Sequence, residues 1–305
     1  MNLNGLDLNL LVALDALLQH RNVTRAGEQL HITQSAMSGC LARLRAHFGD
    51  PLLVPLGRQL HLTSVADALV RPVRAILIQI EAVVQTQPVF EPAASSRQFR
   101  IMASDYGATV LIADLLRQIR DTAPNVGVEI VPFSDAPSHS LEEGDIDLLL
   151  SARELLAADH PSEVLFKDDF VCLAWAGNRR IGKHPTLAQF LGLAHVVVKY
   201  GKHSVSHMEE RFFRSTGFHR RVEVVVSSFN TVPHMVVGTH RIATIHRRLA
   251  LLYAATLPLK VLALPVRPPT IEQSMQWHAH RESDPGGAWL RAQTRAVANG
   301  LRHGR

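Results

Sequence analysis

The sequence has little cysteine and no long hydrophobic run. Cys40 and Cys172 are the only cysteines among 305 residues; two thiols cannot form a disulfide framework and fit a reducing cytosol. No apolar run reaches the roughly 18 residues needed to cross a bilayer. The N-terminus, MNLNGLDLNL, lacks the basic region of a signal peptide. These absences exclude a disulfide-rich secreted domain, and we expect a cytoplasmic protein without a membrane span.

Recognisable catalytic and metal-binding motifs are also missing. Residues 177–183 nearly spell a P-loop, but His184 and Pro185 follow where the motif needs Ser or Thr. No G-x-S-x-G elbow of a serine hydrolase occurs. The histidine pairs at 203/207 and 278/280, the second expected on a strand, lack Cys, Asp or Glu neighbours in a zinc spacing. We therefore expect no enzyme, no cofactor and no metal site.

Charge is distributed unevenly along the chain. The formal net charge is +5, and a length of 305 residues suggests two domains. Residues 91–166 hold five basic and thirteen acidic side chains, whereas residues 167–267 hold fifteen basic and five acidic ones. Two explanations stay open: the neighbouring segments attract each other, or a basic wall draws in an anionic ligand.

Residues 23–49, VTRAGEQLHITQSAMSGCLARLRAHFG, predict two short amphipathic helices joined by a polar turn. Thr33 is a natural N-cap for the second helix. With the apolar side chains turned inward, Gln34, Ser38 and Arg45 share an outer face. Small polar groups near a helix N-terminus, with an arginine further along, suit a recognition helix in the major groove of DNA. An ordinary helical hairpin would show the same periodicity.

The neighbouring segments complete a winged helix-turn-helix. A first helix is expected over residues 8–20, and LLVPLGRQLHLT predicts two short strands with Arg58 at the wing tip, in reach of a phosphate or minor groove. Thr63 caps a long helix over residues 64–85, which Pro72 should kink or stop early. Its apolar residues repeat as in a coiled-coil seam, at Leu69, Val73, Ile76, Ile80 and Val83.

Beyond a linker at residues 88–96, strands and helices alternate, which predicts an α/β domain. Expected elements include the strand RQFRIMAS, a helix from about residue 108 to 121, and the strands VGVEIVPF and IDLLLS. A second α/β unit holds DFVCLAWA, HVVVKY, RRVEVVVS and RIATIH. The chain then returns to the first unit, giving two lobes joined by two crossovers.

Several segments resemble the LysR-type transcriptional regulators. LDLNLLVALDALLQHRNVTRAGEQLHITQSAMS and RLRAHFGDPLLVPLGRQLHLT are similar to the DNA-binding domain of that family. FEPAASSRQFRIMASDYG, RRVEVVVSSF, GTHRIATIHRRL and SDPGGAWLR resemble the branch of nodulation-gene and salicylate- or nitroaromatic-responsive activators. The order and spacing of these segments are highly specific, and the resemblance covers the whole chain.

The resemblance implies an α+β protein in three parts. Residues 1–63 would form the winged helix-turn-helix, 64–96 the dimerising linker helix and linker, and 97–305 a two-lobed, periplasmic-binding-protein-like effector domain. Lobe I would cover about 97–164 and 268–305, and lobe II about 165–267. The implied function is sequence-specific regulation of transcription by a homodimer or homotetramer bound to double-stranded DNA. The rival hypothesis is a two-lobed small-molecule-binding protein without a regulatory role.

The resemblance also assigns candidate site residues. DNA-binding candidates are Thr33, Gln34, Ser35, Ser38, Arg43, Arg45 and Arg58. Effector candidates in the cleft between the lobes are Ser104, Asp105, Asp168, His203, Phe229 and Gln276. Gly39 departs from the polar residue common in the family, and Asp168 stands where some relatives have a neutral or basic donor. The implied effector is an aromatic acid or phenolic compound, and the charge distribution favours an anionic aromatic.

Overall fold

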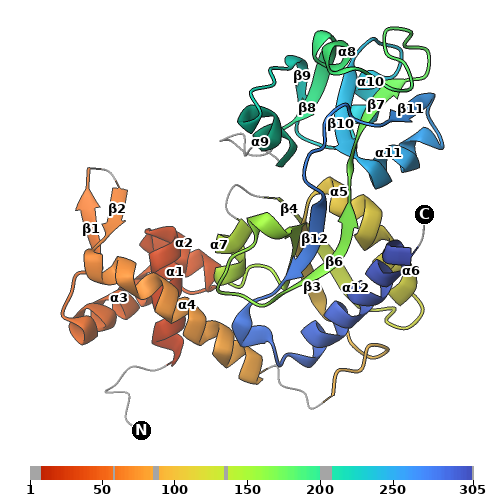
Figure 1. Ribbon diagram of the computed structural model, residues 1–305. Coiled ribbons are helices and arrows are strands. Elements are labelled where there is room, and N and C mark those ends of the chain that lie inside the picture. The colour runs from red at the N-terminus through yellow and green to blue at the C-terminus, as the bar shows by residue number, and fades with distance from the viewer. Residues whose placement is uncertain (1–7, 58, 85–88, 134–136, 200–207, 304–305) are drawn as a thin grey trace. The chain divides into compact units, whose positions relative to one another are not determined.

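The computed structural model describes residues 8–57, 59–84, 89–133, 137–199 and 208–303, with the side chains of 81–84, 208 and 303 left out (Figure 1). The chain divides into two compact units. The first comprises residues 1–87 with 142–144, and the second comprises residues 88–141 and 145–305. Within the described ranges, no helix combines the length and the apolar character needed to span a bilayer.

The N-terminal unit is a winged helix-turn-helix, as predicted. Its elements are α1 (Leu8–His20), α2 (Val23–Gln29), α3 (Gln34–Phe48), the antiparallel strands β1 (Leu53–Leu56) and β2 (Gln59–Leu62), and α4 (Ser64–Val84). Leu14, Met37 and Leu44 are fully buried at its centre. Helix α1 packs against α2, α3 and α4, so one small core fixes the pose of α3.

Side-chain caps fix the ends of these helices. Thr33 Oγ1 accepts a hydrogen bond from the Ala36 backbone N–H at the start of α3, and Thr63 Oγ1 accepts one from Ala66 before α4. Helix α4 continues through Pro72 to Val84, so the expectation of an early stop is wrong. Proline removes only one helical hydrogen bond, and the next residue, Val73, packs into the core of this unit.

Lobe I is built on a five-stranded sheet with the order β4-β3-β5-β12-β6. The strands are β3 (Gln98–Ala103), β4 (Gly127–Pro132), β5 (Leu148–Ala152), β6 (Ser162–Asp168) and β12 (Ile271–Gln276). β3 runs parallel to β4 and β5, and β12 lies antiparallel to β5 and β6. The helical elements are α5 (Asp105–Gly107), the π-helical η1 (Ala108–Ile112), α6 (Ala113–Ile119), α7 (Pro137–Glu142), η2 (Arg153–Leu155), η3 (Ala279–Arg281) and α12 (Pro285–His303).

Lobe II has a second five-stranded sheet with the order β11-β7-β10-β8-β9. Its strands are β7 (Phe170–Trp175), β8 (Ala194–Val198), β9 (Arg221–Val226), β10 (Ile242–His246) and β11 (Leu259–Leu262). Its helices are α8 (Leu187–Gly192), α9 (Met208–Ser215), α10 (Val232–Val236) and α11 (Arg247–Ala254). Two lobes joined by two crossovers confirm the predicted α/β architecture of the effector domain.

Three local expectations need correction. Strand β6 stays in the sheet of lobe I through Asp168, so the crossover lies later than residue 165. The helix expected from about residue 108 begins at Asp105, because Ser104 caps it through a hydrogen bond from the Gly107 N–H. His278 and His280 belong to the cap and turn of η3 rather than to a strand, because His278 Nδ1 accepts the His280 N–H.

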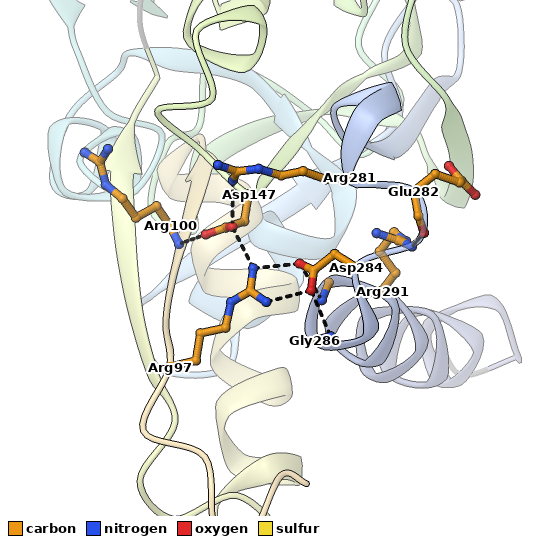
Figure 2. Close-up of polar contacts among 9 residues, drawn as sticks. Arg97, Arg100, Asp147, Arg281, Glu282, Asp284, Gly286 and Arg291 are labelled. Atoms are coloured by element: carbon orange, nitrogen blue, oxygen red, sulfur yellow. Dashed lines mark hydrogen bonds and ion pairs between the residues drawn. The ribbon is translucent and has the colours of Figure 1, made fainter. Parts of the chain in front are cut away.

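An ionic cluster joins the starts of β3, β5 and α12 with η3 in lobe I (Figure 2). The guanidinium group of Arg97, just before β3, donates to both carboxylate oxygens of Asp284, at 2.8 and 2.7 Å. Arg97 and Arg281 also donate to Asp147, just before β5. A Cβ atom on Gly286 would lie 2.6 Å from the Arg97 guanidinium. The cluster therefore fixes the start of α12 against the starts of β3 and β5.

Candidate DNA-binding surface and effector pocket

The outward side of α3 carries the predicted polar residues. Gln34, Ser35 and Ser38 are all exposed on its first turns. Thr33 Oγ1 lies 2.9 Å from Ser35 Oγ, so both side chains take part in the helix cap. A Cβ atom built on Gly39 would meet no other part of the chain within 4 Å. The position beside Ser38 is therefore open, but it has no side chain that could contact DNA. This arrangement offers an amide and hydroxyl groups at a helix N-terminus, as base reading requires.

The arginines predicted to bind DNA differ in their surroundings. Arg45 Nε donates to the Pro51 carbonyl oxygen at 2.8 Å, and Arg45 Nη2 donates to that of Leu53 at 3.1 Å. Arg45 thus ties α3 to the start of the wing, which sequence spacing along one helix could not reveal. Arg43 is exposed on α3, and Arg58 lies outside the described residues.

The predicted dimerisation seam on α4 faces two environments. Val73 is buried in the core of the N-terminal unit, and Leu69 and Ile80 pack partly against that core. Ile76 leaves 43% of its surface exposed. The side chain of Val83 lies outside the described set. A helix that packs on its own domain thus explains the buried members, and among the seam residues with described side chains Ile76 is the one presented to solvent.

A pocket lies between the two lobes of the effector domain. Its cavity volume is about 50 Å³. Lobe I contributes Ser104, Tyr106, Phe133, Leu150, Ser151, Ala152, Leu155, Ile271 and Gln273, and lobe II contributes Phe170, Glu209, Phe229 and His246. Many of these residues follow or end parallel strands, where open α/β sheets bind ligands.

Stacked aromatic rings form the wall that the lobes share. The ring of Tyr106 stacks on the imidazole of His246, with centroids 3.8 Å apart and an interplanar angle of 11°. Phe229 meets the edge of His246 at 4.6 Å, and Phe170 lies 5.3 Å from it. Phe229 is only 5% exposed. Such a wall suits a planar apolar ligand.

Two predicted effector residues, Ser104 and Phe229, line this pocket. Within the described lining, Asp105, Asp168 and Gln276 are absent. Gln276 is fully buried, and its amide bonds the backbone of Ala157 and His160. Gln273, three residues earlier on β12, lines the pocket instead, because side chains an odd number apart point to opposite faces of a strand. His203 lies outside the described residues.

Asp168 sits at the crossover between β6 and β7 and is 5% exposed. Its Oδ2 accepts a 2.6 Å hydrogen bond from the Tyr106 hydroxyl, and its Oδ1 accepts the Asp169 backbone N–H. Burial raises the pKa of Asp168 above its ordinary value, although the Tyr106 hydrogen bond acts in the opposite direction. Burial, together with the charge of Asp168, also raises the pKa of Tyr106 well above its usual value. Asp168 therefore anchors the pocket wall rather than facing a ligand.

One carboxylate in the pocket lining comes from lobe II. Glu209, 5% exposed at the start of α9, is paired with Arg220, which also binds Glu210. The Arg220 guanidinium lies 4.1 Å from the centre of the Phe213 ring. Burial raises the pKa of Glu209, while Arg220 opposes that rise. Arg214 also pairs with Glu210, at 3.5 Å, so two guanidinium groups balance the two carboxylates when all four groups are ionised.

Sequence reasoning missed several lining residues, and two of them carried a usable signal. His246 ends the predicted strand RIATIH, so the rule for strand ends would have found it. Tyr106 directly follows the predicted Ser104 and Asp105. Glu209 and Phe170 gave no local signal, because only the folding of lobe II brings them to the pocket.

Two family descriptions match the chain. "Bacterial regulatory helix-turn-helix protein, lysR family" matches residues 8–67, and "LysR substrate binding domain" matches residues 92–299. Nodulation protein D 1 of Mesorhizobium japonicum is 39% identical over 95% of this chain and 93% of its own length. Nodulation protein D of Bradyrhizobium sp. (strain ANU 289) is 38% identical over 95% of this chain and 86% of its own length.

Solved structures share the fold over nearly the whole length. A probable transcriptional regulator of Pseudomonas aeruginosa is 29% identical, with a TM-score of 0.67, over 96% of this chain and 97% of that one. A full-length OxyR variant from the same organism is 18% identical, with a TM-score of 0.72, over 96% of each chain. The OxyR comparison supports the fold alone.

Proposed function

The chain belongs to the LysR family of bacterial transcriptional regulators, and we propose that a small aromatic molecule bound between its lobes controls its activity. Family membership makes it a DNA-binding regulator with an effector-binding domain. The observation that carries the choice of effector is the wall formed by Tyr106, Phe170, Phe229 and His246. Planar rings gain contact area and favourable ring geometry against such a wall.

The polar lining favours a phenolic hydroxyl over a carboxylate on that ring. Within the described lining, Glu209 is the only carboxylate, and no lysine or arginine contributes. A phenol can donate a hydrogen bond to the Glu209 carboxylate, and hydrogen bonds to ionised acceptors are the stronger kind. A carboxylate effector would meet like charge in a buried site. The anionic aromatic expected from the charge distribution therefore becomes the alternative outcome of the test.

DNA recognition in this proposal uses α3, and assembly uses α4. Gln34 and Ser38 would read base edges, while Arg43 and Arg58 would contact phosphates. The exposed Ile76 supports pairing of two α4 helices, because a large apolar side chain gains most from leaving water. Such a homo-oligomer would present two recognition helices to operator DNA in the bacterial cytoplasm.

Calorimetry with matched ligands tests the effector class. Full-length protein is titrated with phenols and with carboxylates built on the same one- and two-ring skeletons. We expect the phenols to bind more tightly, and Glu209→Gln to weaken them about tenfold by removing a charge-assisted acceptor. Glu210→Gln is the matched control, since Glu210 pairs with the same arginine but lies outside the described lining. Preference for carboxylates, or equal losses in both variants, would contradict the phenolic assignment.

A further inference from the structure

Asp105, the predicted effector ligand, instead binds the opposite lobe. Its Oδ2 accepts a hydrogen bond from Ser228 Oγ at 2.7 Å and another from the Asn230 backbone N–H at 2.7 Å. Asp105 opens α5 in lobe I, whereas residues 228–230 follow β9 in lobe II. A carboxylate that accepts two short hydrogen bonds is a strong point of attachment. The carboxylate of Asp105 thus holds lobe I to lobe II.

The side chain of Asn230 adds to the same attachment. Its Nδ2 donates to Thr109 Oγ1 at 2.9 Å and to the Asp105 carbonyl oxygen at 3.4 Å. Thr109 lies in the π-helical segment Ala108–Ile112. Such segments carry an extra residue per turn and often mark functional positions in helices. Here the π turn places a threonine hydroxyl within reach of lobe II.

Phe229 stands between the two attached residues. Its neighbours Ser228 and Asn230 both donate to Asp105, so its backbone cannot shift without breaking those bonds. Its ring lines the pocket, 4.6 Å from the ring of His246 and 6.4 Å from that of Tyr106. The position of this part of the pocket wall therefore depends on Asp105, although Asp105 lies outside the described lining.

We propose that these hydrogen bonds form an interlobe latch, made by Asp105, Thr109, Ser228 and Asn230. The latch holds Phe229 over the pocket and opens when an effector enters or leaves. Asp105 is thereby a positioning residue for the effector response. Its regulatory role rests on the proposed function, but the latch itself requires no ligand. Opening the latch exposes the Asn230 amide and frees Phe229 while leaving both sheets intact.

Hydrogen exchange of the full-length protein without ligand, followed by mass spectrometry, tests the latch. In Asp105→Ala, peptides covering residues 227–236 should exchange at least about tenfold faster, because the Asn230 N–H loses its acceptor. Asp105→Asn should restore part of the protection, since its amide oxygen still accepts. Asp114→Asn is the matched control, because Asp114 pairs with Arg117 within α6.

A second variant keeps the test decisive if Asp105→Ala fails to fold. Ser228→Ala removes one donor without touching α5, and should give a smaller increase confined to the same peptides. Unchanged exchange of residues 227–236 in these variants would overturn the latch. A uniform increase across residues 97–303 would also overturn it, because Asp105 would then only support the fold. Because no ligand is added, failure of the phenolic assignment leaves this result intact.

Discussion

The hydroxyl group of Tyr106 donates a 2.6 Å hydrogen bond to the carboxylate of Asp168 and so ties the first helix of lobe I to the crossover between the lobes. Both side chains are buried. The same tyrosine ring stacks on His246 in the pocket. Tyr106 therefore connects the pocket wall with the crossover between the lobes. Removing its hydroxyl group alone would break the bond to Asp168 and keep the ring stacked on His246.

Tyr106→Phe should lower the free energy of unfolding by about 1–3 kcal/mol, because a buried carboxylate loses a donor. Folding raises the pKa of Asp168. The stability that this shift adds to the folded protein is therefore complete below the unfolded pKa and is lost as pH rises through the folded pKa. Losing the donor raises that pKa further. The cost should therefore be larger at pH 7 than near pH 4 in urea titrations. Equal costs at both pH values would contradict this, and so would an equal cost for Tyr253→Phe, a change at a partly buried tyrosine on α11.

The Arg97–Asp284 pair should respond to pH in the opposite direction. Burial opposes ionisation of Asp284, but the hydrogen bond and charge of Arg97 and two backbone N–H groups hold its pKa below the ordinary value. The pair therefore stabilises above the unfolded pKa of about 4 and weakens as pH falls through the folded pKa. Asp284→Asn should cost about 2–3 kcal/mol at pH 7 and less near pH 3. Asp114→Asn, which breaks the exposed Asp114–Arg117 pair, should change the free energy of unfolding little at either pH.

Base reading by α3 is tested with Gln34→Ala. Loss of a side chain that contacts a base edge should weaken binding to the specific site by about 1–3 kcal/mol and leave random DNA nearly unaffected. Gln79→Ala, an exposed glutamine on α4, is the control. Fluorescence anisotropy at fixed salt gives both affinities. Equal losses of affinity for specific and random DNA would show that Gln34 on α3 does not read a base.

Assembly through α4 is tested at its exposed apolar residue. Ile76→Asp should weaken self-association by several kcal/mol, because it places an unpaired charge in an apolar interface. Ser64→Asp adds the same charge at an exposed polar position in the first turn of α4, about 120° around the helix from Ile76, and should leave assembly intact. Sedimentation velocity over a concentration series distinguishes them. If both variants keep the wild-type assembly, another surface must form the oligomer.

Local pattern predicted the N-terminal unit well, because helical periodicity and caps such as Thr33 act over a few residues. It could not show that Arg45 binds wing carbonyl groups, since that contact depends on how the wing returns to α3. The resemblance assigns Gln276 to the effector, and strand parity, which places Gln273 in the lining, cannot be counted without the true strand limits. Asp105 is assigned to the ligand by the resemblance and by its place after the first strand; its actual partners, Ser228 and Asn230, lie more than a hundred residues away and leave no local signal.

Thermal unfolding of the full-length protein with the matched phenol and carboxylate series tests the central claim most directly. A ligand that binds only the folded state stabilises it by RT ln(1 + [L]/Kd), so at a fixed concentration the tighter ligand raises Tm more. Ala152→Phe, at the end of β5, would fill the pocket with a ring. The account predicts that phenols raise the wild-type Tm and lose this effect in Ala152→Phe. Equal Tm shifts in both proteins, or shifts with carboxylates alone, would contradict it.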